Sequence, residues 1–212
     1  MPSEWPFEGN GVQSDIEKFL EIATGRRSVR RFTGQPVSID ALRPALEAFR
    51  FAPSAGNRQP WRLVIVQDRE TIDRIGQDIS AQPNVFSGAG ALLVVYANPF
   101  ESWAHVRGGI GASWQHIYLN DLGAAIQNLL LAIHATGLGA VWIGYFNQIE
   151  LGKVIKTPRE LEPIALIPVG TYDEDASHGR PVRRPPSEVF FAEDFEHPLG
   201  AGDEQDGRRR ST

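Results

Sequence analysis

Apolar positions recur along the chain with two periods, one typical of helices and one typical of strands. The helical period predicts helices over residues 15–24, from Ser38 onward, and over 115–135 and 149–155, with a short surface helix over 70–79. Runs of β-branched and apolar residues predict strands at 61–66, 91–96, 140–143 and 164–169. Strands and helices mix without a regular alternation, so the pattern predicts one α+β domain.

Two of the predicted helices have unusual features. Pro44 lies inside the helix that Ser38 caps, and an interior proline typically costs about 3 kcal/mol. We therefore expect a kink there or a later helix start. The helix over 115–135 has apolar residues on more than one side, with alanines thinning one face. We expect this helix to lie buried at the centre or against a partner.

The ends of the chain differ in composition from its middle. Residues 1–13 are expected to be a mobile N-terminal segment, residues 14–197 the folded domain and residues 198–212 a disordered tail. Residues 98–113 have no clear period and are typical of a functional loop such as a lid. The segment 181–195 holds three prolines before a short apolar run, which is typical of an arm that packs on another subunit.

Composition narrows the function classes. The chain has no cysteine, which excludes disulfides, thiolate metal sites and thiol nucleophiles. Its net charge of -5 gives no overall attraction to nucleic acid, and no apolar run is long enough to span a bilayer. The N-terminus lacks the pattern of a secretory signal, so the default expectation is a cytoplasmic protein.

Searches for common catalytic motifs find nothing usable. There is no Walker loop and no Gly-x-Ser-x-Gly elbow, and Gly109-Ile110-Gly111 lacks the third glycine of a dinucleotide fingerprint. The five histidines show no metal-ligand spacing, so no metal site is predicted. His134 is interpreted as a packed or capped residue of the long helix.

Two basic clusters stand out in this acidic chain. One is the stretch Arg26-Arg27-Ser28-Val29-Arg30-Arg31-Phe32, and the other contains Arg180, Arg183 and Arg184. In an extended chain Arg26, Ser28 and Arg30 share one face, where two guanidiniums and a hydroxyl suit a phosphate. The alternative is that both clusters are simply solvated surface.

An irregular loop is predicted between a helix and a strand, with the sequence Ala52-Pro53-Ser54-Ala55-Gly56-Asn57-Arg58-Gln59-Pro60-Trp61. Ser54, Asn57 and Gln59 offer donors and acceptors that suit the edge of a flat heterocycle. The alternative, a plain turn, needs far fewer specified residues.

A third stretch follows the long helix and reads Gly137-Leu138-Gly139-Ala140-Val141-Trp142-Ile143-Gly144-Tyr145-Phe146. A strand that ends in glycine lets backbone approach a ligand closely. The alternative is a helix stop followed by a buried strand.

Together these stretches resemble the nitroreductase superfamily of FMN proteins. The resemblance extends through Asp121-Leu122-Gly123-Ala124-Ala125-Ile126-Gln127-Asn128-Leu129 to Arg183-Arg184-Pro185-Pro186, and order and spacing hold from about residue 15 to 192. It implies one nitroreductase-like domain with a central, mostly antiparallel sheet flanked by helices. It also implies a homodimer with FMN at the interface and a C-terminal arm that reaches the partner subunit.

The resemblance also implies roles for individual residues. Arg26 and Ser28 would hold the FMN phosphate and ribityl end, joined by Arg183 or Arg184, and Arg30 would approach the pyrimidine edge of the flavin. The backbone around Ile143 and Gly144 would lie near flavin N5, and the loop residues would come from the other subunit. The full predicted cofactor site comprises Arg26, Arg27, Ser28, Arg30, Pro53, Ser54, Ala55, Asn57, Gln59, Trp142, Ile143, Gly144, Arg183 and Arg184.

The chemistry implied by the family is a ping-pong reaction. NAD(P)H reduces FMN, and an electron-poor acceptor, a nitroaromatic or a quinone, then takes the electrons, so no catalytic side chain is required. Compared with many family members, residues 82–89 are short and lack Lys and Arg, and loop 98–113 is compact.

Three alternatives remain open. One is a specialised flavoprotein: a reductive dehalogenase, a flavin-consuming enzyme of cobamide synthesis or a deazaflavin-related protein. The others are a non-catalytic flavin-binding protein and a dimeric module without a cofactor.

Overall fold

The computed structural model describes residues 12–103, 116–173, 176 and 182–200. The chain falls into two compact units, Met1–His178 and Gly179–Thr212, which are described separately. The predicted N-terminal segment 1–13, the predicted tail 198–212 and loop 98–113 lie mostly outside the described residues. Whether 14–197 forms one domain stays a prediction.

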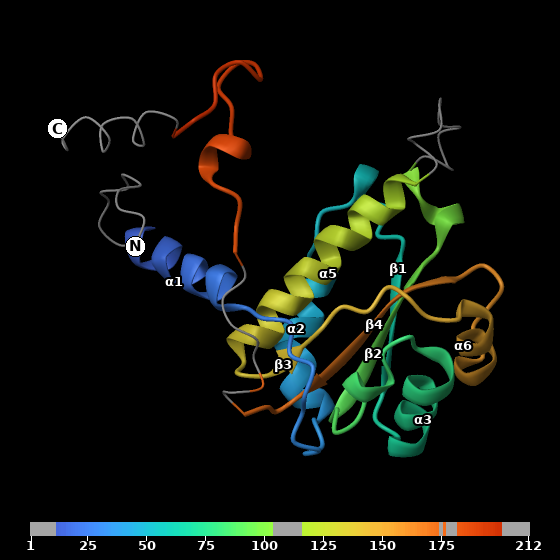
Figure 1. Ribbon diagram of the computed structural model, residues 1–212. Helices are drawn as coiled ribbons and strands as arrows, with labels where there is room; N and C mark the ends of the chain where they lie inside the picture. The colour runs from blue at the N-terminus through green and yellow to red at the C-terminus, as the bar shows by residue number, and fades with distance from the viewer. Residues whose placement is uncertain (1–11, 104–115, 174–175, 177–181, 201–212) are drawn as a thin grey trace. The chain divides into compact units, whose positions relative to one another are not determined.

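A four-stranded antiparallel sheet forms the centre of the first unit (Figure 1). Its order is β1-β2-β4-β3, with bounds β1 (Trp61–Val66), β2 (Ala91–Ala97), β4 (Glu162–Gly170) and β3 (Gly139–Ala140). The β2–β4 register shifts between Val95 and Tyr96. The chain thus has the α+β fold predicted from the sequence, with a central antiparallel sheet and flanking helices.

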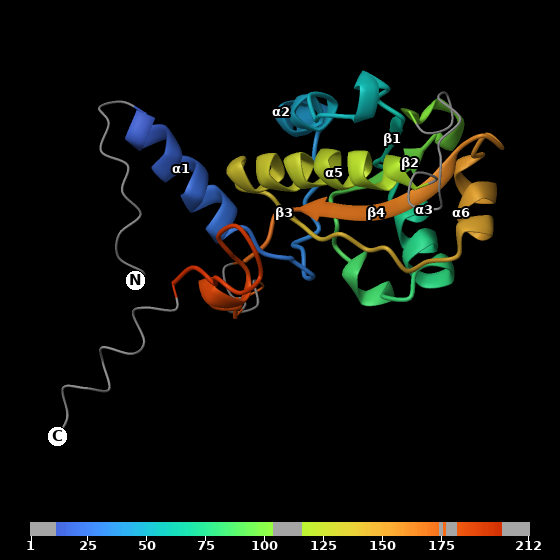
Figure 2. The ribbon, with the colours of Figure 1, turned by 90° about the horizontal axis from the view of Figure 1, so that it is seen from above.

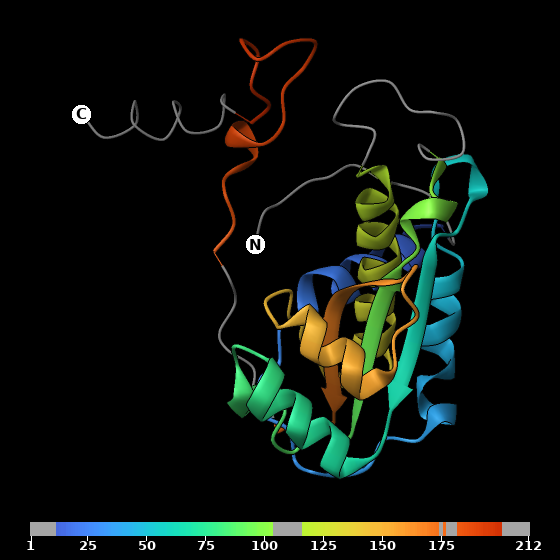
Figure 3. The ribbon, with the colours of Figure 1, turned by 90° about the vertical axis from the view of Figure 1, so that its right-hand side faces the viewer.

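Helices cover both faces of this sheet (Figures 2 and 3). Leu93 and Val95 of β2 belong to the core cluster that includes residues of α2 (Ile39–Arg50) and α5 (Ile117–Ala135). Leu92 and Val94 belong to the opposite cluster, with residues of α3 (Arg69–Arg74) and α6 (Gln148–Ile155). Every residue of β2 is buried, because alternate side chains enter two different cores.

Side-chain caps fix where the helices begin. Ser38 Oγ accepts the Ala41 N–H at 3.1 Å, and Asn147 Oδ1 accepts the Ile149 N–H at 3.1 Å. The expectation of a later start for the second helix is wrong, because α2 begins at Ile39 and continues through Pro44. Burial of its apolar face, comprising Leu42, Ala45 and Phe49, offsets the lost backbone donor.

The remaining elements complete the first unit with small departures from the prediction. Helix α1 (Val12–Gly25) begins earlier than expected and leaves Phe19 and Leu20 exposed. Helix α3 continues into a π-helical turn, η2 (Ile75–Ile79), in which Ile75 and Ile79 are buried. The predicted surface helix therefore contributes one side to the core. Among the described helices, none has the length and apolar character needed to cross a membrane.

The second unit is described from residue 182. It contains the 3₁₀ turn η7 (Pro186–Glu188) and an antiparallel bridge between Phe191 and Pro198. The Phe191 and Phe195 rings meet edge to face with centroids 5.1 Å apart. Val182 and Phe195 are nevertheless 96% and 86% exposed, so this unit presents apolar surface to its surroundings.

Candidate functional site

The basic stretch after α1 is extended and runs beside β3. Ser28 forms a parallel bridge with Ala140, and the Val29 N–H donates to the Ala140 carbonyl at 3.1 Å. Val29 is buried, so its alternate neighbours Ser28 and Arg30 face away from the core. The backbone therefore has the alternation that the predicted phosphate cradle requires.

A small cavity opens where this stretch meets the end of α5. Arg26, Arg27, His134 and Tyr172 are among the side chains that line it. One Arg27 nitrogen donates to the Thr24 carbonyl at 2.6 Å and the Arg26 carbonyl at 2.8 Å, so this guanidinium caps the end of α1. Arg26, the first residue of the predicted cradle, thus lies in a cationic cluster at the C-terminal end of α5.

The predicted flavin-edge loop has a fixed and strained backbone. Gly56, Asn57 and Gln59 have φ of 57°, 54° and 51°, and the 3₁₀ turn η1 (Ala55–Asn57) includes two of these residues. Ser54 Oγ accepts the Gln59 N–H at 3.0 Å, and Gln59 Nε2 donates to Asn57 Oδ1 at 3.1 Å. Left-handed non-glycine residues are uncommon and gather at functional sites, and this loop is largely exposed. It is therefore far more specified than a plain turn needs.

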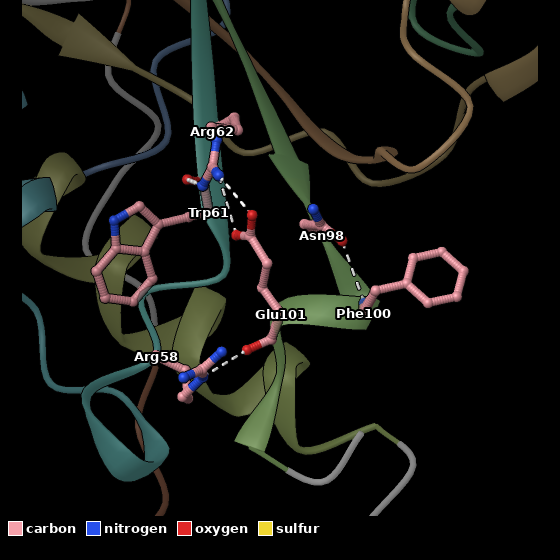
Figure 4. A network of polar contacts seen from close by, with 6 residues as sticks. All are labelled: Arg58, Trp61, Arg62, Asn98, Phe100 and Glu101. Carbon is pink, nitrogen blue, oxygen red and sulfur yellow. Dashed lines mark hydrogen bonds and ion pairs between the residues drawn. The ribbon is translucent and has the colours of Figure 1, made fainter. Parts of the chain in front are cut away.

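The loop is braced against the segment that follows β2 (Figure 4). Arg58 Nε donates to the Glu101 carbonyl at 3.1 Å, and an Arg62 nitrogen donates to the Glu101 carboxylate at 2.8 Å. A Cβ added to Gly56 would lie 2.0 Å from Trp103, so the indole ring packs directly on the loop backbone. The start of the predicted loop 98–113 therefore holds this face of the molecule in place.

Asp121, near the start of α5, is a residue of this site that sequence reasoning did not assign. Its Oδ1 accepts the Ala55 N–H at 2.9 Å, and the residue is only 6% exposed. Its Oδ2 is buried and has no hydrogen-bond partner among the described residues. Burial raises the pKa of this carboxyl, and the Ala55 hydrogen bond partly opposes that rise. The sequence signal that could have identified Asp121 is an acidic residue, four positions before Ala125, on a buried face of the helix.

Asp121→Asn is expected to be more stable than the wild type at pH 7, by about 1 kcal/mol, because it keeps the Ala55 bond and removes a buried charge. The folded pKa of Asp121 lies above its unfolded value, so wild-type stability falls as pH rises between the two. The advantage of the variant should therefore vanish below about pH 4. Urea unfolding of both proteins from pH 3.5 to 7.5 measures this, and a pH-independent difference would contradict it.

The third predicted stretch is shorter as a strand than expected. Strand β3 covers only Gly139 and Ala140, and pairing with β4 resumes in the same register at Ile143, which bridges Leu166. In that register Val141 lies opposite Pro168, which has no N–H to continue the ladder. The Ile143 side chain is buried, and its N–H and carbonyl both pair with Leu166 at 2.9 Å. In the described part of the chain, the neighbouring Gly144 N–H has no such partner. Trp142 and Gly144 lie exposed on the outer side.

Gly139 and Gly144 of this stretch differ in how much space the fold leaves for a side chain. A Cβ on Gly139 would lie 2.7 Å from Tyr172 and 2.8 Å from Val29, so the fold itself requires glycine there. A Cβ on Gly144 would meet nothing nearer than the Trp142 indole nitrogen at 4.0 Å. The packing of this chain does not explain the glycine at 144, which leaves open backbone on the surface.

One chain does not bring the predicted cofactor residues together. The loop is held by Asp121 near the start of α5, whereas Arg26 and Arg27 lie beside His134 at its end. These two helix positions are about 20 Å apart at 1.5 Å per residue. The loop also leads into β1 at one edge of the sheet, and the basic stretch runs beside β3 at the other (Figure 1).

Arg183 and Arg184 lie in the second compact unit and are exposed. One Arg184 nitrogen lies 3.5 Å from a Glu188 carboxylate oxygen. Their contact with a phosphate stays a prediction.

The donor set at these places fits FMN. A guanidinium and a hydroxyl at Arg26 and Ser28 suit a phosphate monoester. The Asn57 and Gln59 amides offer donors and acceptors for a heterocyclic edge, and the Gly144 N–H offers a donor beside open surface. Among the described residues, no group of three or more His, Asp or Glu side chains is placed to hold a metal ion.

Comparison with known proteins places these features in a family. A profile of the Nitroreductase family matches residues 23–117 and 84–171. An FMN reductase [NAD(P)H] of Bacillus subtilis is 26% identical over 85% of this chain and 75% of its own length. An iodotyrosine deiodinase of Thermotoga neapolitana is 28% identical over 75% of this chain and 91% of its own length. The crystal structure of a nitroreductase family protein from Clostridium difficile 630 matches with a TM-score of 0.68 and 26% identity, covering 82% of this chain and 98% of that one.

Proposed function

The chain belongs to the Nitroreductase family and is an NAD(P)H-dependent oxidoreductase that uses FMN. We propose that it works in the cytoplasm as a homodimer whose two active sites are shared between the subunits. Bound FMN supplies the atom that accepts a hydride and later releases two electrons. The proposed reaction is ping-pong, with an electron-poor nitroaromatic or quinone as acceptor. The chain's own residues bind and orient the reactants.

The basic stretch is the proposed binding site for the FMN phosphate. The Arg26 guanidinium and the Ser28 hydroxyl would hold the phosphate and ribityl end, with Arg27 nearby and Arg183 or Arg184 joining them. Arg30 would lie toward the pyrimidine edge, where a cation stabilises the negative charge of the reduced flavin. The extended backbone of 26–30 beside β3 supports this assignment.

The backbone at Gly144 is the proposed neighbour of flavin N5. Its N–H can donate a hydrogen bond, and the missing side chain leaves the surface open to a flat ring. Trp142 is exposed on the same stretch and would pack near the ring. The backbone N–H and carbonyl of Ile143 pair with Leu166. Ile143 would therefore hold Gly144 in place and would not hydrogen-bond the flavin itself.

The observation that carries the shared-site proposal is the separation of the two predicted halves along α5. A two-fold axis that places two copies of α5 antiparallel would set the end of one helix beside the start of the other. The loop residues Pro53, Ser54, Ala55, Asn57 and Gln59 of one chain would then face the phosphate stretch of its partner. A loop that is rigid yet exposed within its own chain is consistent with that role.

Uncovered apolar surface supports a partner subunit. Leu119 on α5 is 42% exposed, and a Cβ added to Gly123, one turn later, would meet nothing within 4 Å. Phe19 and Leu20 on α1 are about half exposed. We propose that these surfaces, together with the arm that contains Val182 and Phe195, are buried between subunits.

Mixed dimers test whether the site is shared. Arg26→Ala removes the phosphate contact, and Asn57→Gly removes the loop amide while keeping the left-handed backbone. If the basic stretch and the loop of each site come from different subunits, a heterodimer of the two variants has one intact site out of two. NAD(P)H-dependent turnover should then recover to about half the wild-type value, following the site count. No recovery in a purified, doubly tagged heterodimer would show that each site lies within one chain.

The acceptor is proposed more broadly than the cofactor. One relative is named an iodotyrosine deiodinase and another an FMN reductase, so an iodotyrosine and free FMN must be compared with the proposed nitroaromatic and quinone acceptors. Turnover with each of these four compounds decides between them. Parallel double-reciprocal lines for NADH against the preferred acceptor are expected for the ping-pong order, and intersecting lines would overturn it.

A further inference from the structure

His134 occupies the last turn of α5, where its ring lies against the end of α1. A Cβ added to Gly25 would come within 3.0 Å of His134 Nε2, so the glycine makes room for the ring. The ring lines the same cavity as Arg26 and Arg27. This cavity has room for about one water molecule and opens to solvent, so a phosphate would be held at its mouth.

Two cationic side chains act on this ring. In the described part of the chain, the charged groups that act on His134 are Arg26 and Arg27, and the remaining titratable group in the cavity wall is Tyr172. Burial first, and then these two guanidiniums, lower the pKa of His134. The ends of α1 and α5 carry partial negative charge, which favours the protonated ring.

We propose that His134 is a third cation of the phosphate site, which takes up a proton when the phosphate monoester dianion of FMN binds beside Arg26 and Arg27. The bound phosphate brings two negative charges beside a ring on which Arg26 and Arg27 act as positive charges. Its attraction for a protonated imidazole reverses the repulsion by the guanidiniums. This inference rests on the proposed position of the FMN phosphate.

The coupling between protonation of His134 and FMN binding fixes how the FMN affinity changes with pH. Binding raises the pKa of His134 above its value in the unliganded protein, so a proton is taken up at pH values between the two. Across that window the affinity for FMN falls as pH rises, by up to about tenfold per pH unit for one proton. Below the window the ring is protonated in both states, and above it in neither, so the affinity no longer changes.

The test is a titration of flavin-free protein with FMN between pH 6.5 and 8.5, followed by flavin fluorescence. Because its second pKa is about 6, the phosphate is about three quarters dianionic at pH 6.5 and almost fully so above about pH 7.5. Its own titration would raise the affinity with pH, opposite to the change predicted for His134. The wild type should lose affinity toward pH 8.5 and take up protons in calorimetry at pH 7 in two buffers of different ionisation enthalpy. Riboflavin, which lacks the phosphate, should show neither effect.

Two variants separate the charge of His134 from its packing. His134→Gln should remove proton uptake and flatten the pH profile at the weak affinity of the wild type at pH 8.5. His134→Lys carries a fixed charge and should flatten the profile at the tight affinity seen at pH 6.5. If the two substitutions acted only by damaging the fold, both variants would bind FMN more weakly than the wild type at pH 6.5, and both would have a lower midpoint of thermal unfolding.

Two outcomes are distinguishable. If His134→Gln keeps the wild-type pH profile and proton uptake while Arg26→Ala weakens FMN binding, the role of His134 is wrong and the phosphate site stands. If Arg26→Ala binds FMN as tightly as the wild type, the phosphate site itself is wrong.

Discussion

Arg26→Ala is expected to weaken FMN binding by roughly 2–4 kcal/mol, because a charge-assisted contact to a partly buried phosphate is lost. This corresponds to about a 30- to 700-fold rise in Kd. Riboflavin affinity should change much less, since it has no phosphate. Fluorescence titration with both flavins measures the difference.

Arg43→Ala is the matched control. It removes the same charge from α2, where Arg43 is exposed and pairs with Asp40 at 2.7 Å. Its effect on FMN affinity should be small, since long-range attraction between exposed charges is screened by salt. Equal losses in both variants would mean that net charge, and not a phosphate contact, decides FMN affinity.

Gly144→Ala is expected to slow flavin reduction by NAD(P)H by about 100-fold while leaving the fold intact. The added methyl group has open space in the chain itself, but it would push a stacked ring away from the Gly144 N–H. A displacement of about 1 Å at a reacting centre can cost two orders of magnitude in rate. Stopped-flow reduction at saturating NAD(P)H measures the rate, and thermal unfolding checks the fold.

Gly139→Ala, in contrast to Gly144→Ala, is expected to destabilise the fold. Its methyl group would meet Tyr172 and Val29 below 3.0 Å, so the free energy of unfolding should fall by about 1–3 kcal/mol. The pair thus separates a glycine required by a ligand from a glycine required by packing. If Gly144→Ala reduces flavin at the wild-type rate, the assignment of Gly144 beside N5 is wrong.

Most of the fold could be predicted from local signals. The run at 91–97 is apolar at every position because both faces of β2 are covered, and that pattern is visible without tertiary contacts. Ser38 marked the start of α2 because capping depends on one side chain and the next three backbone amides.

Features that depend on distant contacts were harder to predict. The break in β3 after Ala140 depends on the pairing of Val141 with Pro168 of β4, and no local pattern in 140–143 encodes it. Pro44 suggested a disrupted helix, yet burial of Phe49 and its neighbours decides the outcome. In both cases tertiary packing overrides a local preference.

The same division applies to the site. The irregular loop was visible because Pro53, Gly56 and Pro60 exclude regular structure. Its anchor was not, because Asp121 lies 66 positions from Ala55. His134 was read as a packed helix residue, and only the folded chain shows that it shares a cavity with Arg26 and Arg27.

The most direct test of the flavin-enzyme account is the visible spectrum of the purified protein during anaerobic titration with NADH and then NADPH. The protein should be yellow as isolated or after incubation with FMN. One of the two nucleotides should bleach the flavin band, and a nitroaromatic or quinone should restore it. A protein that takes up no FMN, or a bound flavin that neither nucleotide bleaches, would contradict the account.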